Sequence, residues 1–197
     1  MTGLLIVFEG LDQSGKETQA RILRRWFEAR GRQVESLAFP DYATPIGAEI
    51  WKGLHHERDF GPDTLQLLLI ANRFEWKPRI QEWLGAGRVV ICDRYLASSV
   101  AYGDAQGLDP HWLAATQAYL PQPDATVLLD IAPDVAAARK ATGRDKFESD
   151  LPMLARVRAS YLRQAADLLW VVVDAARPVD AVAADVASAI ATRLGLP

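Results

Sequence analysis

The sequence predicts an α/β protein in which a five-stranded parallel sheet is covered by helices on both faces. Short apolar runs, typical of buried strands, alternate with longer segments of helical periodicity. The order strand then helix recurs five times, which favours parallel strands joined by helical crossovers. The 197 residues are 50% hydrophobic and 24% charged, which fits one domain with a sizeable core.

The first elements follow from periodicity and from residues that begin or end a helix. Residues 4–8 are all apolar and predict a buried strand. A helix is expected over 16–30, because apolar residues recur there at three- and four-residue spacing, and residues 34–39 form a weaker strand. Thr44 before Pro45 has the residue types of an N-cap and a first helical position.

The same alternation continues to the end of the chain. Pro62 opens a long helical pattern that runs to about Leu84, and the apolar residues 89–92 predict the next strand. The remaining expected elements are a mainly helical stretch over 95–119 interrupted near Gly103 and Gly107, a strand over 126–131, helices over 134–140 and 151–169, a strand over 170–173 and a helix over 179–194. No stretch has the composition of a domain linker, so residues 1–197 are predicted to form a single domain.

Bulk composition excludes several classes of function. The formal net charge of −3 provides no basic field for nucleic acid. No apolar run approaches the roughly 20 residues of a membrane span, and no basic, apolar leader opens the chain. The one cysteine, Cys92, lies in an apolar run and is expected to be a buried hydrophobe. A cytoplasmic protein that binds neither membranes nor nucleic acid is expected.

A glycine-rich loop directly follows the first strand. Gly10, four residues, Gly15 and Lys16 have the spacing of a P-loop, whose backbone N–H groups and helix N-terminus bind the phosphates of a nucleotide. Lys16 is the candidate catalytic cation that reaches the β- and γ-phosphates. The predicted ATP-binding residues are Gly10, Leu11, Asp12, Gln13, Ser14, Gly15, Lys16, Glu17 and Thr18.

The residue after Lys16 departs from the P-loop pattern. A Ser or Thr hydroxyl normally ligates Mg²⁺ there, but this chain has Glu17, and Thr18 points elsewhere around the helix. Glu17 either binds Mg²⁺, directly or through a water, or stabilises the helix N-terminus by its charge. Both readings stay open at this point.

A second polar segment follows the third predicted strand. Asp93 stands at the end of an apolar run, the position of a carboxylate that orients Mg²⁺ or its waters. Arg94 would then reach the same crevice, where a guanidinium can bind phosphate with two parallel hydrogen bonds. The alternative is an ion pair between Asp93 and Arg94. We predict Arg94 to be catalytic and Asp93 to be a metal ligand.

Motifs in order along nearly the whole chain resemble those of the thymidylate kinase family. They are Phe8-Glu9-Gly10-Leu11-Asp12 with Gly15-Lys16, Phe39-Pro40 with Thr44, Ile46 and Gly47, Ala71-Asn72-Arg73, Asp93-Arg94-Tyr95 with Ser98 and Ala101-Tyr102, Pro123-Asp124 with Leu129-Asp130 and Pro133, and Val173-Asp174-Ala175. The resemblance implies a three-layer P-loop kinase fold with a mobile lid at about 140–150. It also implies phosphorylation of dTMP to dTDP by ATP and Mg²⁺, and a homodimer.

The resemblance also implies roles for single residues. Asp12 would contact the 3′-hydroxyl of the acceptor sugar, Arg73 the base or the phosphate, and Arg94 the acceptor phosphate together with the transferred group. The remaining implied residues are Phe39, Pro40, Leu69, Ser98 and Tyr102 around the acceptor, Arg144 and Lys146 as catalytic cations of the lid, and Asp174 and Ala175 near adenine.

Three positions depart from the family pattern. Gln13 stands where some members carry a catalytic arginine, so Arg144 of the lid is expected to supply that charge. Leu69 stands where the family usually stacks an aromatic ring on thymine, and Gly103 where many members have a polar side chain. Base selection is therefore expected either to be relaxed or to rest on nearby groups such as Gln66 or Ser98. A kinase for another nucleoside monophosphate, or a catalytically weak nucleotide-binding homologue, remains the alternative.

Overall fold

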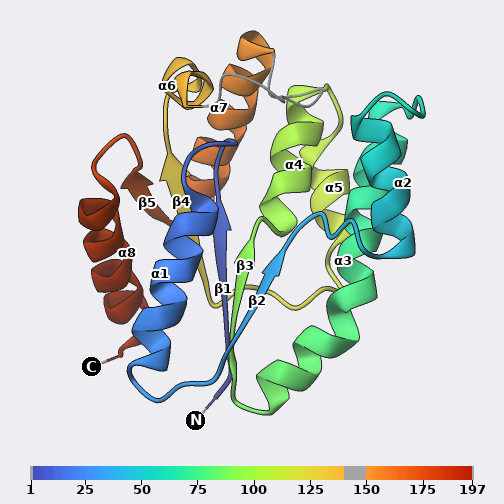
Figure 1. Ribbon diagram of the computed structural model, residues 1–197. Coiled ribbons are helices and arrows are strands. Elements are labelled where there is room, and N and C mark those ends of the chain that lie inside the picture. Colours follow the sequence, from blue (N-terminus) through green and yellow to red (C-terminus); the bar gives the residue numbers. More distant parts are fainter. Residues whose placement is uncertain (1, 140–149, 197) are drawn as a thin grey trace.

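The computed structural model describes residues 2–139 and 150–196 and contains a five-stranded sheet (Figure 1). Its strands lie in the order β2-β3-β1-β4-β5, and every neighbouring pair is parallel, as predicted. The strands are β1 (Leu4–Glu9), β2 (Val34–Ala38), β3 (Val89–Asp93), β4 (Ala125–Asp130) and β5 (Val171–Asp174). The predicted lid, with Arg144 and Lys146, falls almost entirely outside the described residues.

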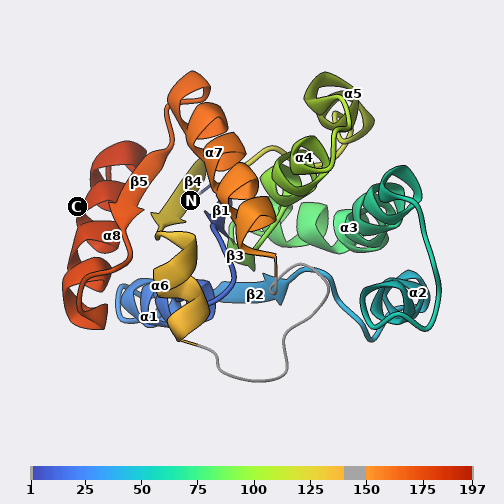
Figure 2. The ribbon, with the colours of Figure 1, turned by 90° about the horizontal axis from the view of Figure 1, so that it is seen from above.

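Helices cover both faces of this sheet (Figure 2). Helices α1 and α8 pack together on one face, whereas α3, α4 and α7 lie on the other. The helices are α1 (Lys16–Glu28), α2 (Pro45–Leu54), α3 (Pro62–Gly85), α4 (Leu96–Ala105), α5 (Pro110–Thr116), α6 (Pro133–Ala138), α7 (Leu151–Asp167) and α8 (Val179–Leu194). The three-layer α/β architecture predicted from the sequence is confirmed.

The helical stretch over 95–119 is interrupted between Ala105 and Pro110, near Gly103 and Gly107 as predicted, although Gly103 itself is helical. Gly103 lies inside α4, and the chain leaves helical geometry only after Ala105, with Gly107 at φ 87°. A Cβ atom at Gly103 would lie 2.3 Å from Cδ1 of the buried Leu113. The glycine therefore permits close packing of α5 on α4 and does not end the helix.

Two helix N-termini differ in a way that bears on function. Thr44 caps α2, as predicted, because its Oγ1 accepts a hydrogen bond of 3.0 Å from the Gly47 N–H. Gly15 precedes α1 and offers no side chain, and no other side chain of the described residues caps this helix. The first N–H groups of α1 are thus available to an anion.

Within residues 2–139 and 150–196, no helix is both long and apolar enough to cross a lipid bilayer. Cys92 lies inside β3 and is buried, as predicted, and this burial raises the pKa of its thiol.

Candidate active site

The parallel register brings the two predicted polar segments to one edge of the sheet. Strands β1 and β3 are neighbours with Phe8 opposite Asp93, and the Arg94 N–H donates a hydrogen bond of 2.8 Å to the Phe8 carbonyl. The loop after β1 and the segment after β3 consequently flank one pocket of about 430 Å³. Ligands of open parallel sheets bind at this carboxyl edge.

Most of the predicted site residues line this pocket. They are Asp12, Gln13, Gly15, Lys16, Glu17, Thr18, Phe39, Pro40, Leu69, Arg73, Asp93, Arg94, Ser98 and Tyr102. Gly10, Leu11 and Ser14 are buried in the loop and do not line the pocket, and neither do Asp174 and Ala175 at the end of β5.

The glycine loop has the tight path that the spacing predicts. Gly10 has φ 139°, and a Cβ atom there would lie 2.5 Å from the Leu129 carbonyl oxygen, so only glycine fits. The Lys16 side chain is buried, and its Nζ donates a hydrogen bond of 2.8 Å to the Leu11 carbonyl. Burial, followed by the charge of Arg94, lowers the pKa of Lys16. A phosphate at the loop would offset both effects by providing a negative partner.

Arg139 connects this loop to the end of β5 and has no counterpart among the sequence-based predictions. Its Nη1 donates to the Gln13 carbonyl at 3.1 Å and its Nη2 to the Ala175 carbonyl at 2.9 Å. Asp174 is exposed, and its carboxylate accepts a hydrogen bond from the Ala176 N–H. Arg139 thus holds the predicted adenine-side residues close to the phosphate loop.

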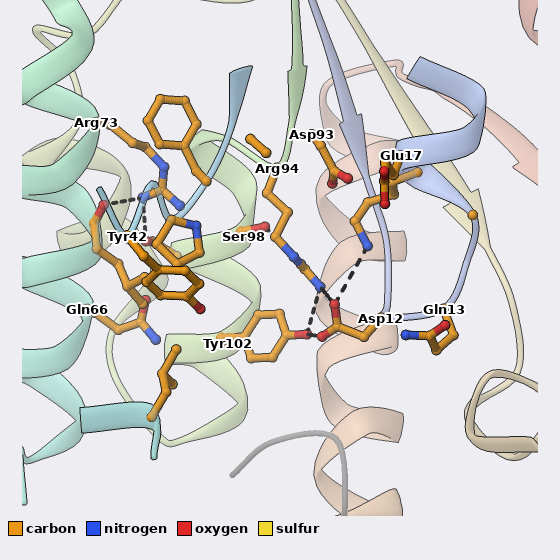
Figure 3. A pocket seen from close by; sticks show the side chains of 18 of the residues that line it. Asp12, Gln13, Glu17, Tyr42, Gln66, Arg73, Asp93, Arg94, Ser98 and Tyr102 are labelled. Atoms are coloured by element: carbon orange, nitrogen blue, oxygen red, sulfur yellow. Dashed lines mark hydrogen bonds and ion pairs between the residues drawn. The ribbon is translucent and has the colours of Figure 1, made fainter. Parts of the chain in front are cut away.

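Arg94 pairs with Asp12 across the mouth of the loop. Its Nη2 lies 2.7 Å from Asp12 Oδ1, and the Tyr102 hydroxyl donates to Asp12 Oδ2 at 3.2 Å (Figure 3). The alternative pairing with Asp93 is not formed in the described part of the chain. Burial would raise the pKa of Asp12, but the charges of Arg94 and Lys16 outweigh it and hold this pKa well below its usual range.

Glu9 organises the surroundings of Arg94 and was missed as a functional residue. It is fully buried, and its carboxylate accepts hydrogen bonds from the Tyr95 N–H at 2.9 Å, the Ser98 hydroxyl at 2.7 Å and the Tyr161 hydroxyl at 3.0 Å. The same two hydroxyls contact Arg94 Nη1 at 3.1 and 3.2 Å. The sequence contains one sign of this role: Glu9 is a charged residue that ends an otherwise apolar strand, immediately before the glycine loop.

The far end of the pocket is built around Arg73. Its Nη1 donates to Ser99 Oγ at 2.7 Å and to the Leu69 carbonyl at 3.2 Å, and its guanidinium carbon lies 5.9 Å from the centre of the Phe39 ring. Burial lowers the pKa of Arg73 to about 10, so the side chain remains a cation at neutral pH. Figure 3 shows Arg73 and Gln66 on one side of the pocket, Asp12 and Glu17 on the other, and Arg94 between them.

Asp93 and Glu17 are the residues that could hold a metal ion. Both line the pocket, and Figure 3 shows their carboxylates beside the same part of it. Burial raises the pKa of Asp93, while Lys16 and Arg94 act in the opposite direction. The described residues contain no cluster of three or more His, Cys, Asp or Glu side chains that could hold a metal. Two oxygen donors and a phosphate nearby fit Mg²⁺, which keeps several of its waters.

Comparison with known proteins identifies the family. A family model described as thymidylate kinase matches residues 8–186. A thymidylate kinase of Leifsonia xyli is 40% identical, with 93% of this chain and 92% of the relative covered, and that of Caenorhabditis elegans is 37% identical, with 91% and 86% covered.

Similarity in three dimensions agrees with the sequence match. A solved structure of thymidylate kinase from Candida albicans, an enzyme of broad substrate specificity, is 31% identical and has a TM-score of 0.86, with 97% of this chain and 92% of that chain covered. The glycine loop, the Asp12–Arg94 pair and the buried Arg73 therefore lie in a shared framework, and the chain belongs to the thymidylate kinase family.

Proposed function

We propose that the chain transfers the γ-phosphoryl group of ATP to the 5′-phosphate of dTMP, giving dTDP and ADP. The observation that carries the proposal is one continuous pocket with an uncapped helix N-terminus and Lys16 at one end, Arg94 in the middle and the apolar-walled Arg73 at the other. The phosphates of ATP need the first of these sites, the phosphate of the nucleoside monophosphate needs the cation in the middle, and its base needs the apolar end. Membership of the thymidylate kinase family supports the choice of acceptor.

The chemistry proposed is a direct in-line transfer. An oxygen of the dTMP 5′-phosphate forms a bond to the γ-phosphorus as the bond from this phosphorus to the β–γ bridging oxygen breaks, and ADP leaves. No covalent enzyme intermediate is required, because positioning and charge stabilisation suffice. Lys16 and Arg94 are the cations placed to stabilise the charge that spreads over the transferred group.

The contacts of Arg94 and Lys16 within the protein indicate how these cations are held. Arg94 rests on Asp12, and the Lys16 Nζ is 4.0 Å from the same carboxylate. Incoming phosphates would compete for both cations. Asp12 would then be available to the 3′-hydroxyl of the acceptor sugar, the role that the family resemblance implies, with Tyr102 packed beside the deoxyribose.

Mg²⁺ is proposed to bind between Asp93, Glu17 and the phosphates of ATP. The ion would neutralise part of the phosphate charge and orient the β- and γ-phosphoryl groups. Asp93 and Glu17 would orient the ion or its waters. Glu17→Gln tests whether Glu17 is a ligand: a ligand role requires a higher Mg²⁺ concentration for half-maximal turnover, whereas unchanged Mg²⁺ dependence assigns Glu17 to the helix N-terminus.

Arg144 and Lys146 lie outside the described residues, and their catalytic roles stay predictions. Because Gln13 brings no positive charge to the loop, Arg144 is proposed to stabilise the transition state, with Lys146 second. We also propose a homodimer in the cytoplasm, as is common in the family. Light scattering coupled to size exclusion measures the oligomer directly.

The decisive assay measures ADP formation with dTMP, dUMP, UMP, CMP and thymidine as acceptors. The proposal predicts the highest kcat/KM with dTMP and no turnover of thymidine, which lacks the phosphate that Arg94 would bind. Comparable turnover of all monophosphates would favour a general pyrimidine monophosphate kinase. No turnover of any of them would favour a nucleotide-binding protein without activity.

A further inference from the structure

Gln66 carries a buried amide that the fold leaves unpaired. Its side chain is fully buried in α3, and neither Oε1 nor Nε2 has a hydrogen-bond partner among residues 2–139 and 150–196. Buried side-chain amides are almost always satisfied, because an unmade hydrogen bond leaves the cost of desolvation without compensation. An unpaired amide therefore needs an external partner.

The location of Gln66 indicates what that partner is. Gln66, Leu69 and Arg73 stand at positions i, i+3 and i+7 of α3, share one face of the helix and line the same end of the pocket. Figure 3 shows Gln66 on the side of the pocket that also holds Arg73. The opposite end is taken by the cations and carboxylates of the phosphate loop. A ligand that spans the pocket would place its base, and not its phosphate, against Gln66.

Close packing on Leu113 leaves no room for a side chain at Gly103, which lies beside Gln66. A Cβ atom at Gly103 would lie 3.5 Å from Gln66 Cγ and only 2.3 Å from Leu113 Cδ1. Position 103 thus cannot contribute a polar group of its own. Gln66, which reaches the pocket from α3, is the nearby residue that can.

The surrounding chemistry fits a planar pyrimidine. Phe39 and Leu69 supply apolar walls, and few polar groups converge between them, as in sites that orient a small ring. Arg73 is fixed by Ser99 and the Leu69 carbonyl and can only donate hydrogen bonds, so it favours a ring carbonyl. An amide offers a donor and an acceptor together and can pair with the edge of either kind of pyrimidine. Because the neighbouring Arg73 can only donate, it seats a ring carbonyl and not an amino group, so the two residues together fit a 2,4-dioxopyrimidine edge.

We propose that Gln66 is a specificity-determining residue whose side-chain amide hydrogen-bonds to the edge of the acceptor's pyrimidine ring and, with Arg73, selects a dioxopyrimidine over an aminopyrimidine. The inference deepens the proposed function and rests on it. A hydrogen bond from a rigid, buried site gives strong discrimination, because the wrong ring leaves the protein group unpaired.

The test compares Gln66→Met, which keeps the length of the side chain and removes both polar atoms, with the wild-type enzyme. We expect kcat/KM for dTMP to fall about tenfold, mainly through KM, while kcat/KM for dCMP changes little. Gln19→Met is the matched control, since Gln19 is also buried, does not line the pocket and bonds to the Val179 carbonyl. This control should keep the wild-type ratio of dTMP to dCMP turnover.

Thermal unfolding with and without dTMP separates recognition from structure. Because Gln66 makes no internal hydrogen bond in the described chain, Gln66→Met should leave the Tm of the ligand-free protein unchanged or higher, and should shrink the Tm increase caused by dTMP. The inference would be overturned if Gln66→Met lowered the ligand-free Tm but left both the Tm increase with dTMP and the ratio of dTMP to dCMP turnover unchanged. Gln66 would then be a structural residue that hydrogen-bonds to a buried water.

Two further results keep the inference separate from the proposed function. If the wild-type enzyme does not phosphorylate dTMP, the proposed function fails; if it does and the ratio survives in Gln66→Met, only the inference fails. Should Gln66→Met not fold, Gln66→Asn retains the amide on a shorter side chain and is expected to lower the same ratio. A wild-type ratio in Gln66→Asn would also contradict the inference.

Discussion

The two ends of the pocket are constructed differently. Under the proposed function, the phosphate end is one continuous segment, residues 10–17, which would bind mainly through backbone N–H groups and Lys16. The base end is assembled from Phe39 after β2, Gln66 and Arg73 on α3 and Ser99 on α4, and would bind through side chains. The difference teaches that the proposed phosphate site is a local feature of the sequence, whereas the proposed base site depends on tertiary contacts.

The two ends also differ in how their cations are held. Within the described residues, the N-terminus of α1 has no side-chain cap, and the partners of Lys16 are a carbonyl at 2.8 Å and a carboxylate at 4.0 Å. Arg73, by contrast, is held by a hydroxyl, a carbonyl and the Phe39 face. The groups of the phosphate end are thus available to an anionic ligand, whereas Arg73 at the base end is already held in a fixed position.

The largest effect on turnover is expected from Lys16→Met. Loss of a positioned cation at the transferred group should lower kcat about 10²–10³-fold and leave the dissociation constant of dTMP nearly unchanged. Steady-state kinetics and dTMP binding measure the two quantities, with Lys52→Met, at an exposed lysine of α2, as the control. A loss confined to the KM for ATP would show that Lys16 serves ground-state binding alone.

Glu9→Gln is expected to have the next largest effect. The amide cannot accept all the hydrogen bonds that the carboxylate receives, so Arg94 should lose its fixed position. We expect kcat/KM to fall about 10–100-fold and the free energy of unfolding to fall by about 2–3 kcal/mol, measured by kinetics and by urea denaturation. Unchanged kinetics in a destabilised variant would make Glu9 purely structural.

The pair between Asp12 and Arg94 should be visible in the pH dependence of stability. The pKa of Asp12 is held well below its unfolded value of about 4. The ionised carboxylate therefore stabilises the folded state above about pH 4, and this contribution is lost as pH falls toward the folded pKa. The difference in unfolding free energy between wild type and Asp12→Asn should be flat from about pH 5 to 7 and shrink below about pH 4. A difference that persists unchanged at the lowest pH would contradict the pairing.

The smallest effect is expected from Gly103→Ala. Alanine gains about 1 kcal/mol of helix propensity, but its Cβ would meet the buried Leu113 at 2.3 Å, and overpacking costs about 1–3 kcal/mol. Urea denaturation should therefore show a net loss of less than about 2 kcal/mol, with dTMP binding nearly unchanged, because the same Cβ would be in ordinary contact with Gln66 at 3.5 Å. A gain in stability would show that α5 has room to move.

The contrast between the two ends also explains how much could be read from the sequence. Strand and helix order, the loop from Gly10 to Lys16 and the placement of Asp93 and Arg94 follow from short-range patterns, and the structure confirms their convergence. The partnership of Arg94 with Asp12, 82 residues away, depends on strand order, which periodicity does not specify.

Two residues show why other features of the structure could not be predicted from the sequence. Glu9 is identifiable as unusual from its place in an apolar run, but its bonds to Ser98 and Tyr161 span 89 and 152 residues. Gly103 is a poor helix former, and the interruption predicted near it occurs after Ala105, but its close packing against Leu113 depends on tertiary structure and was not predictable.

The most direct test is a crystal structure of the protein with dTMP and a non-hydrolysable ATP analogue. The account predicts the γ-phosphate on the loop at Lys16, the dTMP phosphate at Arg94, and the thymine ring between Phe39 and Leu69 with its edge toward Arg73. A dTMP phosphate bound at Arg73, or a thymine ring outside this end of the pocket, would contradict the division of the pocket into a phosphate end and a base end.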